Sequence, residues 1–265
     1  MNGIDREINK HRIVVIETLP QRERHTGIEL YDSVLKYKCH FKKDVTAEYH
    51  HPDYRTDFEK ILRDICDSLQ NDEIATIHIE SHGDERGFAL ASGDFIGWKD
   101  LFELTRPINI KCGHLLLLTM SMCKGGFGAI DIEPEKRAPF RAILGTPRIA
   151  SDSDLLECFT IFYENYSNLL DAPKAYSLMN DYMLKNLGAR SPFWLISAKK
   201  QFETILNPPD DQIALKTLSR EYRLLYLQRG ISKTEEELKE KVKYILNNEY
   251  YRYKSFFNFE DIYKP

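Results

Sequence analysis

The chain has 265 residues, 42% of them hydrophobic and 12% aromatic, enough for one sizeable domain with an appendage. Its formal net charge is −4 and its basic residues are scattered, which argues against nucleic acid or an anionic membrane as the main partner. The longest strongly apolar stretch, 114–122, is far shorter than the roughly 20 residues of a membrane-spanning helix. The polar start of the sequence is unlike a signal or transit peptide, so we expect a cytoplasmic protein.

The cysteines are odd in number and have no close pairs, which argues against a disulfide framework and against a structural zinc site. Most of them are expected to be small, buried residues in a reducing compartment. This group comprises Cys39, Cys66, Cys112 and Cys158. Cys123 is different, because it follows a predicted buried strand and precedes two glycines.

The first half of the chain alternates predicted strands and helices. Apolar or alternating runs predict strands at 12–19, 38–45, 74–81 and 114–122. Apolar residues at helical spacing predict helices at 54–69, at 99–105 and after Thr26, which is a candidate N-cap. Residues 87–98 predict a short hairpin that turns near 92–94.

The second half begins with the same alternation and then changes character. We expect strands at 142–147 and 193–197, with helices around 155–163 and 173–186 between them. Pro208 and Pro209 interrupt the chain, and two amphipathic helices follow at 210–228 and 234–257. The predicted domains are therefore 1–207 and a helical hairpin, 208–265, packed on it.

Strands that alternate with helices predict an α/β fold, a three-layer sandwich around a mostly parallel sheet. Binding sites in such sheets lie just beyond the carboxyl ends of the strands. His82 and Cys123 both occupy such positions, each at the end of a buried strand and each with glycine following. Either feature alone is usually structural, whereas the two together indicate a site.

A thiol and an imidazole at one edge of a sheet are the parts of a cysteine hydrolase. Cys123 would be the nucleophile, with its thiolate favoured by Lys124, and His82 would exchange protons with the substrate. The amides of Gly83 and Cys123 would form the oxyanion hole, since glycine leaves the backbone open to substrate. No metal or organic cofactor is needed for this chemistry.

At these residues the chain resembles the caspase-like cysteine peptidases, and within them the CHAT branch, over roughly residues 12–199. The matching segments are IHIESHGDERGFALASGDFIGWKDL, LLLLTMSMCKGG and ILGTPRIASDSDLLECFTIFYENY. Cys123 lies 41 positions after His82 (123 minus 82), near the roughly 50 of caspases. The resemblance implies an endopeptidase that cuts specific protein substrates, is restrained by a regulatory partner, and acts in bacterial signalling or antiviral defence.

The chain also departs from this family at the residues that would select the substrate. Ser121 and Met122 replace the Gln-Ala pair before the caspase cysteine, so a preference for Asp does not carry over. Ser121 also replaces the Asp that helps metacaspases to bind basic side chains. Asp152 and Asp154 are candidates for lining a pocket for Lys or Arg, and helix capping is the competing interpretation for this segment.

Other chemistries fit the sequence less well. His78, Glu80 and His82 alternate on one strand and suggest a metal site, but a packed core histidine is the better interpretation of His78. A nucleobase deaminase would require a Pro-Cys-x-x-Cys motif that the sequence lacks. His50 and His51 are read as a polar loop.

The main alternative to a peptidase is a catalytically inactive module that binds partners through its C-terminal helices. The aromatic end of this segment is rich enough for an interface: Tyr250, Tyr251, Tyr253, Phe256, Phe257 and Phe259. Burial of these rings within the chain would argue against such an interface, and exposure would favour it.

Overall fold

The computed structural model describes residues 7–187, 193–206 and 234–262, together with 219–220, 223–224, 227 and 232. Backbone contacts divide the chain into two compact units. The larger contains the described residues of Ile4–Ile132 and Ala138–Ala198, and the smaller those of Glu133–Arg137 and Lys199–Pro265. The expected domain boundary between 207 and 208 stays a prediction.

The larger unit is built on a six-stranded sheet with the strand order β2-β1-β3-β7-β8-β9. The first five strands in this order are parallel, and β9 runs antiparallel to β8. The strands are β1 (Lys10–Glu17), β2 (Val45–His50), β3 (Glu73–Glu80), β7 (Leu117–Ser121), β8 (Ala142–Gly145) and β9 (Trp194–Ser197). The expected α/β fold with a mostly parallel sheet is confirmed.

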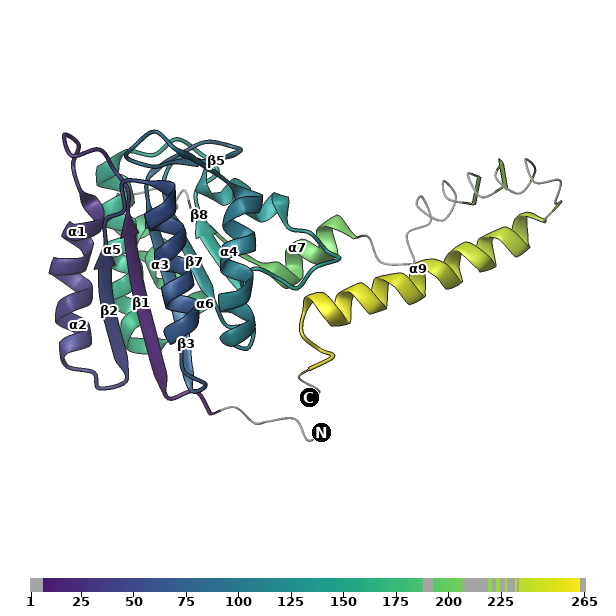
Figure 1. Cartoon of the computed structure of the whole chain (residues 1–265), viewed down its shortest axis with the longest axis horizontal. Coiled ribbons are helices and arrows are strands. Elements are labelled where there is room, and N and C mark those ends of the chain that lie inside the picture. Colours follow the sequence, from purple (N-terminus) through teal and green to yellow (C-terminus); the bar gives the residue numbers. More distant parts are fainter. Residues whose placement is uncertain are drawn as a thin grey trace. The chain divides into compact units, whose positions relative to one another are not determined.

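Helices cover both faces of this sheet (Figure 1), which is why its central strands are apolar on both sides. In β1 the run from Ile13 to Ile16 is fully buried. One helical layer contains α1 (Thr26–Leu30), a π-helical segment (Tyr31–Leu35), α2 (Lys36–His40), α5 (Asp152–Leu169) and α6 (Ala172–Leu187). The other contains α3 (Arg55–Ser68) and α4 (Trp98–Lys111).

The strand expected at 38–45 is wrong, because its first three residues belong to α2 and β2 begins only at Val45. The alternation that suggested it covers only Cys39 and Phe41. Val34 and Leu35, buried one turn earlier, continue a helical stripe into α2. Phe41, which a buried strand would cover, is 69% exposed.

A small three-stranded sheet follows directly after the carboxyl end of β3 in the sequence. It contains β4 (His82–Gly83), β5 (Gly87–Ala89) and β6 (Phe95–Gly97), paired antiparallel. The hairpin predicted at 87–98 is confirmed, and its turn is closed by a hydrogen bond from the Leu90 amide to the Asp94 carbonyl (2.7 Å).

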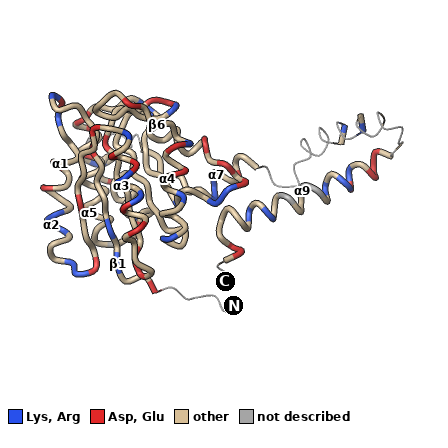
Figure 2. The backbone as a smooth tube through the Cα atoms, viewed as in Figure 1, with Lys and Arg blue, Asp and Glu red and all other residues tan. Residues whose placement is uncertain are grey.

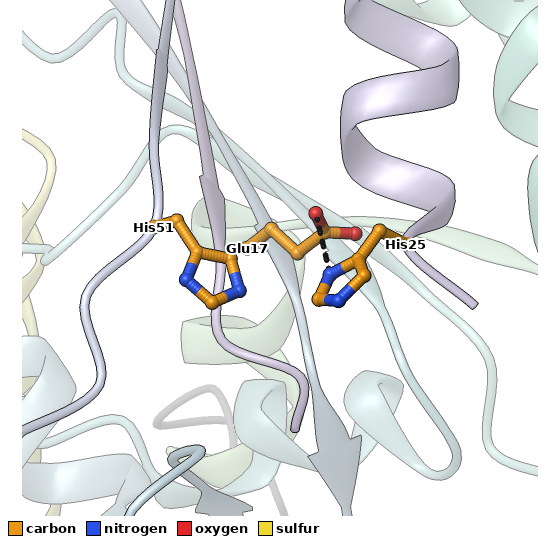
Figure 3. Close-up of side chains that lie close together, drawn as sticks. All are labelled: Glu17, His25 and His51. Carbon is orange, nitrogen blue, oxygen red and sulfur yellow. Dashed lines mark hydrogen bonds and ion pairs between the residues drawn. The ribbon is translucent and has the colours of Figure 1, made fainter. Parts of the chain in front are cut away.

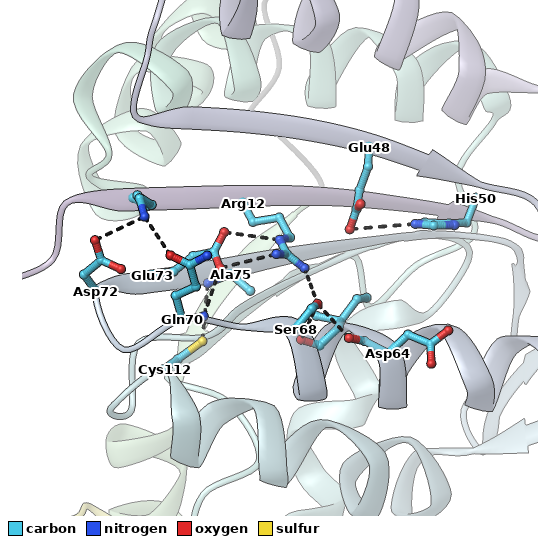
Figure 4. A network of polar contacts seen from close by, with 12 residues as sticks. Arg12, Glu48, His50, Asp64, Ser68, Gln70, Asp72, Glu73, Ala75 and Cys112 are labelled. Carbon is cyan, nitrogen blue, oxygen red and sulfur yellow. Dashed lines mark hydrogen bonds and ion pairs between the residues drawn. The ribbon is translucent and has the colours of Figure 1, made fainter.

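Polar contacts occupy the amino-terminal edge of the main sheet (Figure 4). Arg12 donates to Glu73 across β1 and β3 (3.2 Å) and to Ser68 at the end of α3 (2.8 Å). Glu73 is buried, so this ion pair is better shielded from water than a surface pair. The loops that carry His82 and Cys123 lie at the opposite, carboxyl-terminal edge, because they follow the ends of β3 and β7.

The smaller unit contains most of α7 (Ala198–Ile205) and all of α9 (Glu235–Phe257). Thr234 and Glu237 form a reciprocal capping box at the start of α9, as expected for a helix at 234–257. The first helix of the predicted hairpin, 210–228, lies almost entirely outside the described residues. In the described part of the chain, no helix is long and apolar enough to cross a membrane. Figure 2 shows basic and acidic residues interleaved along both units.

The aromatic end of α9 is partly buried. Phe257 packs against Phe202 with ring centroids 5.0 Å apart, and Phe257 and Phe259 are buried. Arg137 lies over the Phe256 ring at 4.2 Å. Tyr251 and Phe256 are 58% and 39% exposed. Some of the aromatic rings are therefore buried within the chain, and others remain exposed and available for an interface.

Candidate active site

The register between β3 and β7 aligns the two candidate catalytic residues. Glu80 and Ser121 are partners on these adjacent parallel strands, and the Ser81 amide donates to the Ser121 carbonyl (3.3 Å). His82 and Cys123 each follow their strand by the same number of residues. The sheet therefore delivers both to one edge, as the strand-end argument predicted.

Gly83 provides the closest contact between the two strand ends. A Cβ atom built on Gly83 would lie 2.5 Å from the Cys123 carbonyl oxygen and 2.9 Å from Cγ and Sδ of Met122. No side chain fits at that distance, so only glycine lets the His82 strand approach the Cys123 turn in this way. This is the physical reason for the His-Gly pair.

The turn at Cys123 is tight and firmly held. Lys124 adopts a left-handed conformation with φ 57°, which reverses the chain directly after the cysteine. A Cβ on Gly125 would lie 2.6 Å from the Met120 Cβ, so the next position also has no room for a side chain. The Gly126 amide donates to the Thr146 carbonyl (2.9 Å), which fixes the turn to the end of β8.

The Cys123 sulfur is half-buried and contacts the loop that leads into α5. The thiol donates to the Ala150 carbonyl (3.6 Å), and the Ala150 amide points to the sulfur at 3.5 Å. The charge of Lys124 interacts with Cys123, as expected. Its ammonium group also forms an ion pair with Glu85 (2.9 Å), which compensates part of that charge.

His82 has a partner that sequence reasoning did not identify. Its Nε2 lies 2.5 Å from Oε2 of Glu23, in the loop between β1 and α1. Both side chains are largely exposed, so water screens the pair and its role is orientation rather than stability. With Nε2 engaged, Nδ1 is the nitrogen left to exchange protons with a thiol or a substrate. No spacing rule links positions 59 residues apart, so only the fold could reveal Glu23.

Beneath this edge lies a buried polar network that accounts for the alternation of His78 and Glu80. Nδ1 of His78 contacts the Thr119 hydroxyl (2.8 Å), and Nε2 contacts Glu80 (3.3 Å). Thr26 donates to the other oxygen of Glu80 (2.7 Å), rather than capping α1. His78 is fully buried with both nitrogens engaged, so it is a core histidine, as expected.

The other candidate site residues lie in different environments. Ser121 is 1% exposed, and within the described residues its hydroxyl has no hydrogen-bond partner. Asp152 and Asp154 lie in the first turn of α5 and are exposed. Ser151 caps that helix by accepting from the Asp154 amide (3.2 Å), and its hydroxyl donates to the Asp154 carboxylate (2.7 Å). Asp154 is thus engaged in capping, and Asp152 is the freer carboxylate.

Comparison with known proteins supports the fold. No protein-family model matches the chain, and no curated protein matches its sequence. Among solved structures, the chain matches the crystal structure of the Drosophila initiator caspase Dronc with a TM-score of 0.54. The two are 12% identical, and the match covers 72% of this chain and 80% of that chain. Similarity at this identity shows the fold and no more: the chain has a caspase-like α/β fold.

Proposed function

We propose that this chain is a cysteine endopeptidase in which Cys123 is the nucleophile and His82 the general acid and base. The observation that supports it most is the in-register arrival of an accessible thiol and an imidazole–carboxylate pair at one edge of a caspase-like sheet. Neither the thiol nor the imidazole is sealed in the core. That is what a group attacking an incoming peptide requires.

In the proposed reaction the thiol proton of Cys123 passes to His82 as the sulfur forms a bond to the substrate carbonyl carbon. His82 then returns that proton to the leaving amine as the C–N bond breaks, and it activates the water that releases the acyl group. Glu23 is a positioning residue, since it holds Nε2 and so orients the ring. Before attack, the sulfur must leave its contacts with Ala150.

The oxyanion would be bound by the amides of Gly83 and Cys123. Their backbones are in contact, as the 2.5 Å separation of a Gly83 Cβ from the Cys123 carbonyl shows. Among the backbone hydrogen bonds of the described loops and turns, none uses the Cys123 amide as donor. That amide is therefore free to donate to charge that develops on the substrate oxygen.

Substrate selection is proposed to favour a basic side chain before the cut bond. Asp152 is exposed at the start of α5, just after the Ala150 loop that contacts the Cys123 sulfur. Ser121 lies beside the same turn but is buried, so its proposed part in substrate binding would be to support the pocket from beneath rather than to contact the substrate. Selective cleavage of one protein, control by a regulatory partner and a role in bacterial signalling or antiviral defence belong to the same proposal, by likeness to the CHAT branch.

The test is active-site labelling of the whole chain with peptidyl acyloxymethyl ketones that carry Lys, Arg or Asp next to the warhead. We expect the Lys and Arg probes to label one residue, Cys123, as mass spectrometry of the digested protein can identify. Labelling should vanish in Cys123→Ala, fall sharply in His82→Ala and persist in Cys39→Ala, a half-buried thiol elsewhere in the fold. Equal labelling of Cys123→Ala and the unchanged chain would refute the proposal.

The second candidate is a catalytically inactive module that binds a partner through its C-terminal helices. Exposed aromatic rings on α9 favour it: Tyr244 is 68% and Tyr251 58% exposed. In that case no probe labels Cys123 even with candidate partners present. Partner capture would then depend on Tyr244 and Tyr251 and not on Cys123.

A further inference from the structure

Three side chains at the carboxyl edge of the sheet converge on one point (Figure 3). Glu17 ends β1, His25 precedes α1 and His51 follows β2. One potential ligand atom from each lies within 4.8 Å of the other two. Sequence reasoning took His51 as part of a polar loop, because its partners are distant in the chain.

Glu17 is a fixed, fully buried acceptor. Its Oε1 accepts from the Gly27 amide (2.7 Å), and its Oε2 accepts from the Tyr49 hydroxyl (2.6 Å). Nδ1 of His25 lies 3.2 Å from the same Oε2. These contacts hold the carboxylate in place with one oxygen directed at the imidazole, as Figure 3 shows.

Two buried carboxylates near this point make a cation favourable there. Glu17 and Glu80 are register partners on β1 and β3, and both carboxylates are buried. Among the described residues, neither carboxylate forms an ion pair with a lysine or an arginine. Two buried carboxylates side by side are costly without a positive partner, and one divalent ion would neutralise them.

His51 presents an unused ligand atom. Its Nε2 is buried and, within the described part of the chain, has no hydrogen-bond partner. Its Nδ1 lies 3.7 Å from the carboxylate of Asp53. A carboxylate on the far nitrogen of an imidazole is the usual outer-shell arrangement of metal-binding histidines, because it leaves the other lone pair for the ion.

We propose that Glu17, His25 and His51 bind one Zn²⁺ ion. Two imidazoles and a carboxylate are a zinc ligand set with a fourth position open to water. The 3.2 Å between the His25 and Glu17 atoms is close to the roughly 3.3 Å edge of a zinc tetrahedron with bonds of about 2.0 Å. All three ligand atoms lie within 4.8 Å of one another, so a rotation of one imidazole would be needed to bring them to the edge length of that tetrahedron.

The ion would restrain the end of the loop between β1 and α1, because His25 at that end would be one of its ligands. Glu23, the partner of His82, lies two residues before His25 on that loop. Binding of zinc to His25 thus restrains the residue that orients the candidate catalytic imidazole. This consequence rests on the proposed function, whereas the metal site itself does not.

The test is titration of metal-stripped, full-length Cys123→Ala protein with Co²⁺, so that the candidate catalytic thiol cannot supply a ligand. We expect one Co²⁺ per chain with the intense visible bands of a tetrahedral site, displaced by Zn²⁺. His51→Ala should weaken binding by more than about 100-fold, and Asp53→Asn by about tenfold. The matched control, His50→Ala, should bind as before, since His50 pairs with Glu48 (3.7 Å).

Circular dichroism checks that each variant is folded, and His51 is partly exposed, so its loss should be tolerated. In the same background, Zn²⁺ should slow hydrogen exchange of residues 18–25, but not in His51→Ala. Folded protein that binds no Co²⁺, or binds it equally well without His51, overturns the site. If Co²⁺ binds as expected but the unchanged chain is not labelled at Cys123 by the probes, the proposed peptidase function is refuted and the proposed metal site is not.

Discussion

Replacement of Gly83 by alanine probes the contact that joins the two strand ends. The added methyl group would lie 2.5 Å from the Cys123 carbonyl oxygen, whereas ordinary van der Waals contact begins at 3.4 Å. One backbone must therefore retreat by about 0.9 Å (3.4 minus 2.5). Met122, whose Cγ and Sδ would lie 2.9 Å away, can turn aside, but a backbone carbonyl cannot.

Two losses follow from that displacement. Overpacking of a tight site costs about 1–3 kcal/mol of unfolding free energy. A displacement of about 1 Å in a catalytic constellation lowers the rate by roughly 100-fold, because both proposed oxyanion donors lie on the backbones that move. Gly83→Ala should thus slow labelling of Cys123 far more than it destabilises the protein.

Gly97→Ala is the matched control. A Cβ there meets its nearest neighbour, the Arg86 carbonyl oxygen, at 3.7 Å. Since Gly97 precedes α4, the change should cost about 1 kcal/mol or less and leave labelling unaltered. Chemical unfolding and labelling rates of the two variants provide the comparison. Equal stability and equal labelling of Gly83→Ala and Gly97→Ala would refute the close contact on which the site is built.

Three further measurements address individual residues. Glu23→Gln should lower kcat with little change in KM and less than about 1 kcal/mol of stability, since the exposed pair orients His82 rather than supporting the fold; a change confined to KM would contradict this role. Ser121→Ala should be neutral or stabilise the protein in thermal unfolding by up to about 1 kcal/mol, because it removes a buried hydroxyl without a partner among the described residues; a large destabilisation would show that the hydroxyl is satisfied. Burial lowers the pKa of His11 from 6.5 to about 4. Below pH 6.5 the unfolded chain therefore binds a proton at His11 that the folded chain does not bind, and about 3 kcal/mol of stability is lost by pH 4. His11→Gln should reduce this dependence of stability on pH, as denaturant titrations at several pH values can measure.

The strand ends were predictable from the sequence because their signal is local. The apolar runs before His82 and Cys123 identify buried strands, and parallel strands end at a common edge. Their exact register is less predictable, because both faces of these strands are buried and no polar face distinguishes one register from the next. The two candidate residues could therefore be placed at one edge of the sheet without any knowledge of the loops.

The partners of His82 and Lys124 could not be predicted, because they lie on other loops at this edge of the sheet. Glu23 contacts His82 from the loop between β1 and α1, and Lys124 forms an ion pair with Glu85. Both pairings depend on how far a loop extends and in which direction, which spacing does not encode. The strand wrongly expected at 38–45 failed for a related reason, since two alternating residues cannot distinguish a strand from one turn of helix.

These long-range pairings give the end of β1 more influence than its distance in sequence from the dyad suggests. Glu17 ends that strand, Glu23 lies in the loop that follows, and His25 closes the loop at α1. The buried carboxylate of Glu17 thus holds both ends of the loop 18–25, and Glu23 in that loop contacts His82. Any event that changes the charge around Glu17, the binding of a cation above all, should move Glu23 before it disturbs the strands, because β1 is held by ladders on both sides and the loop is not.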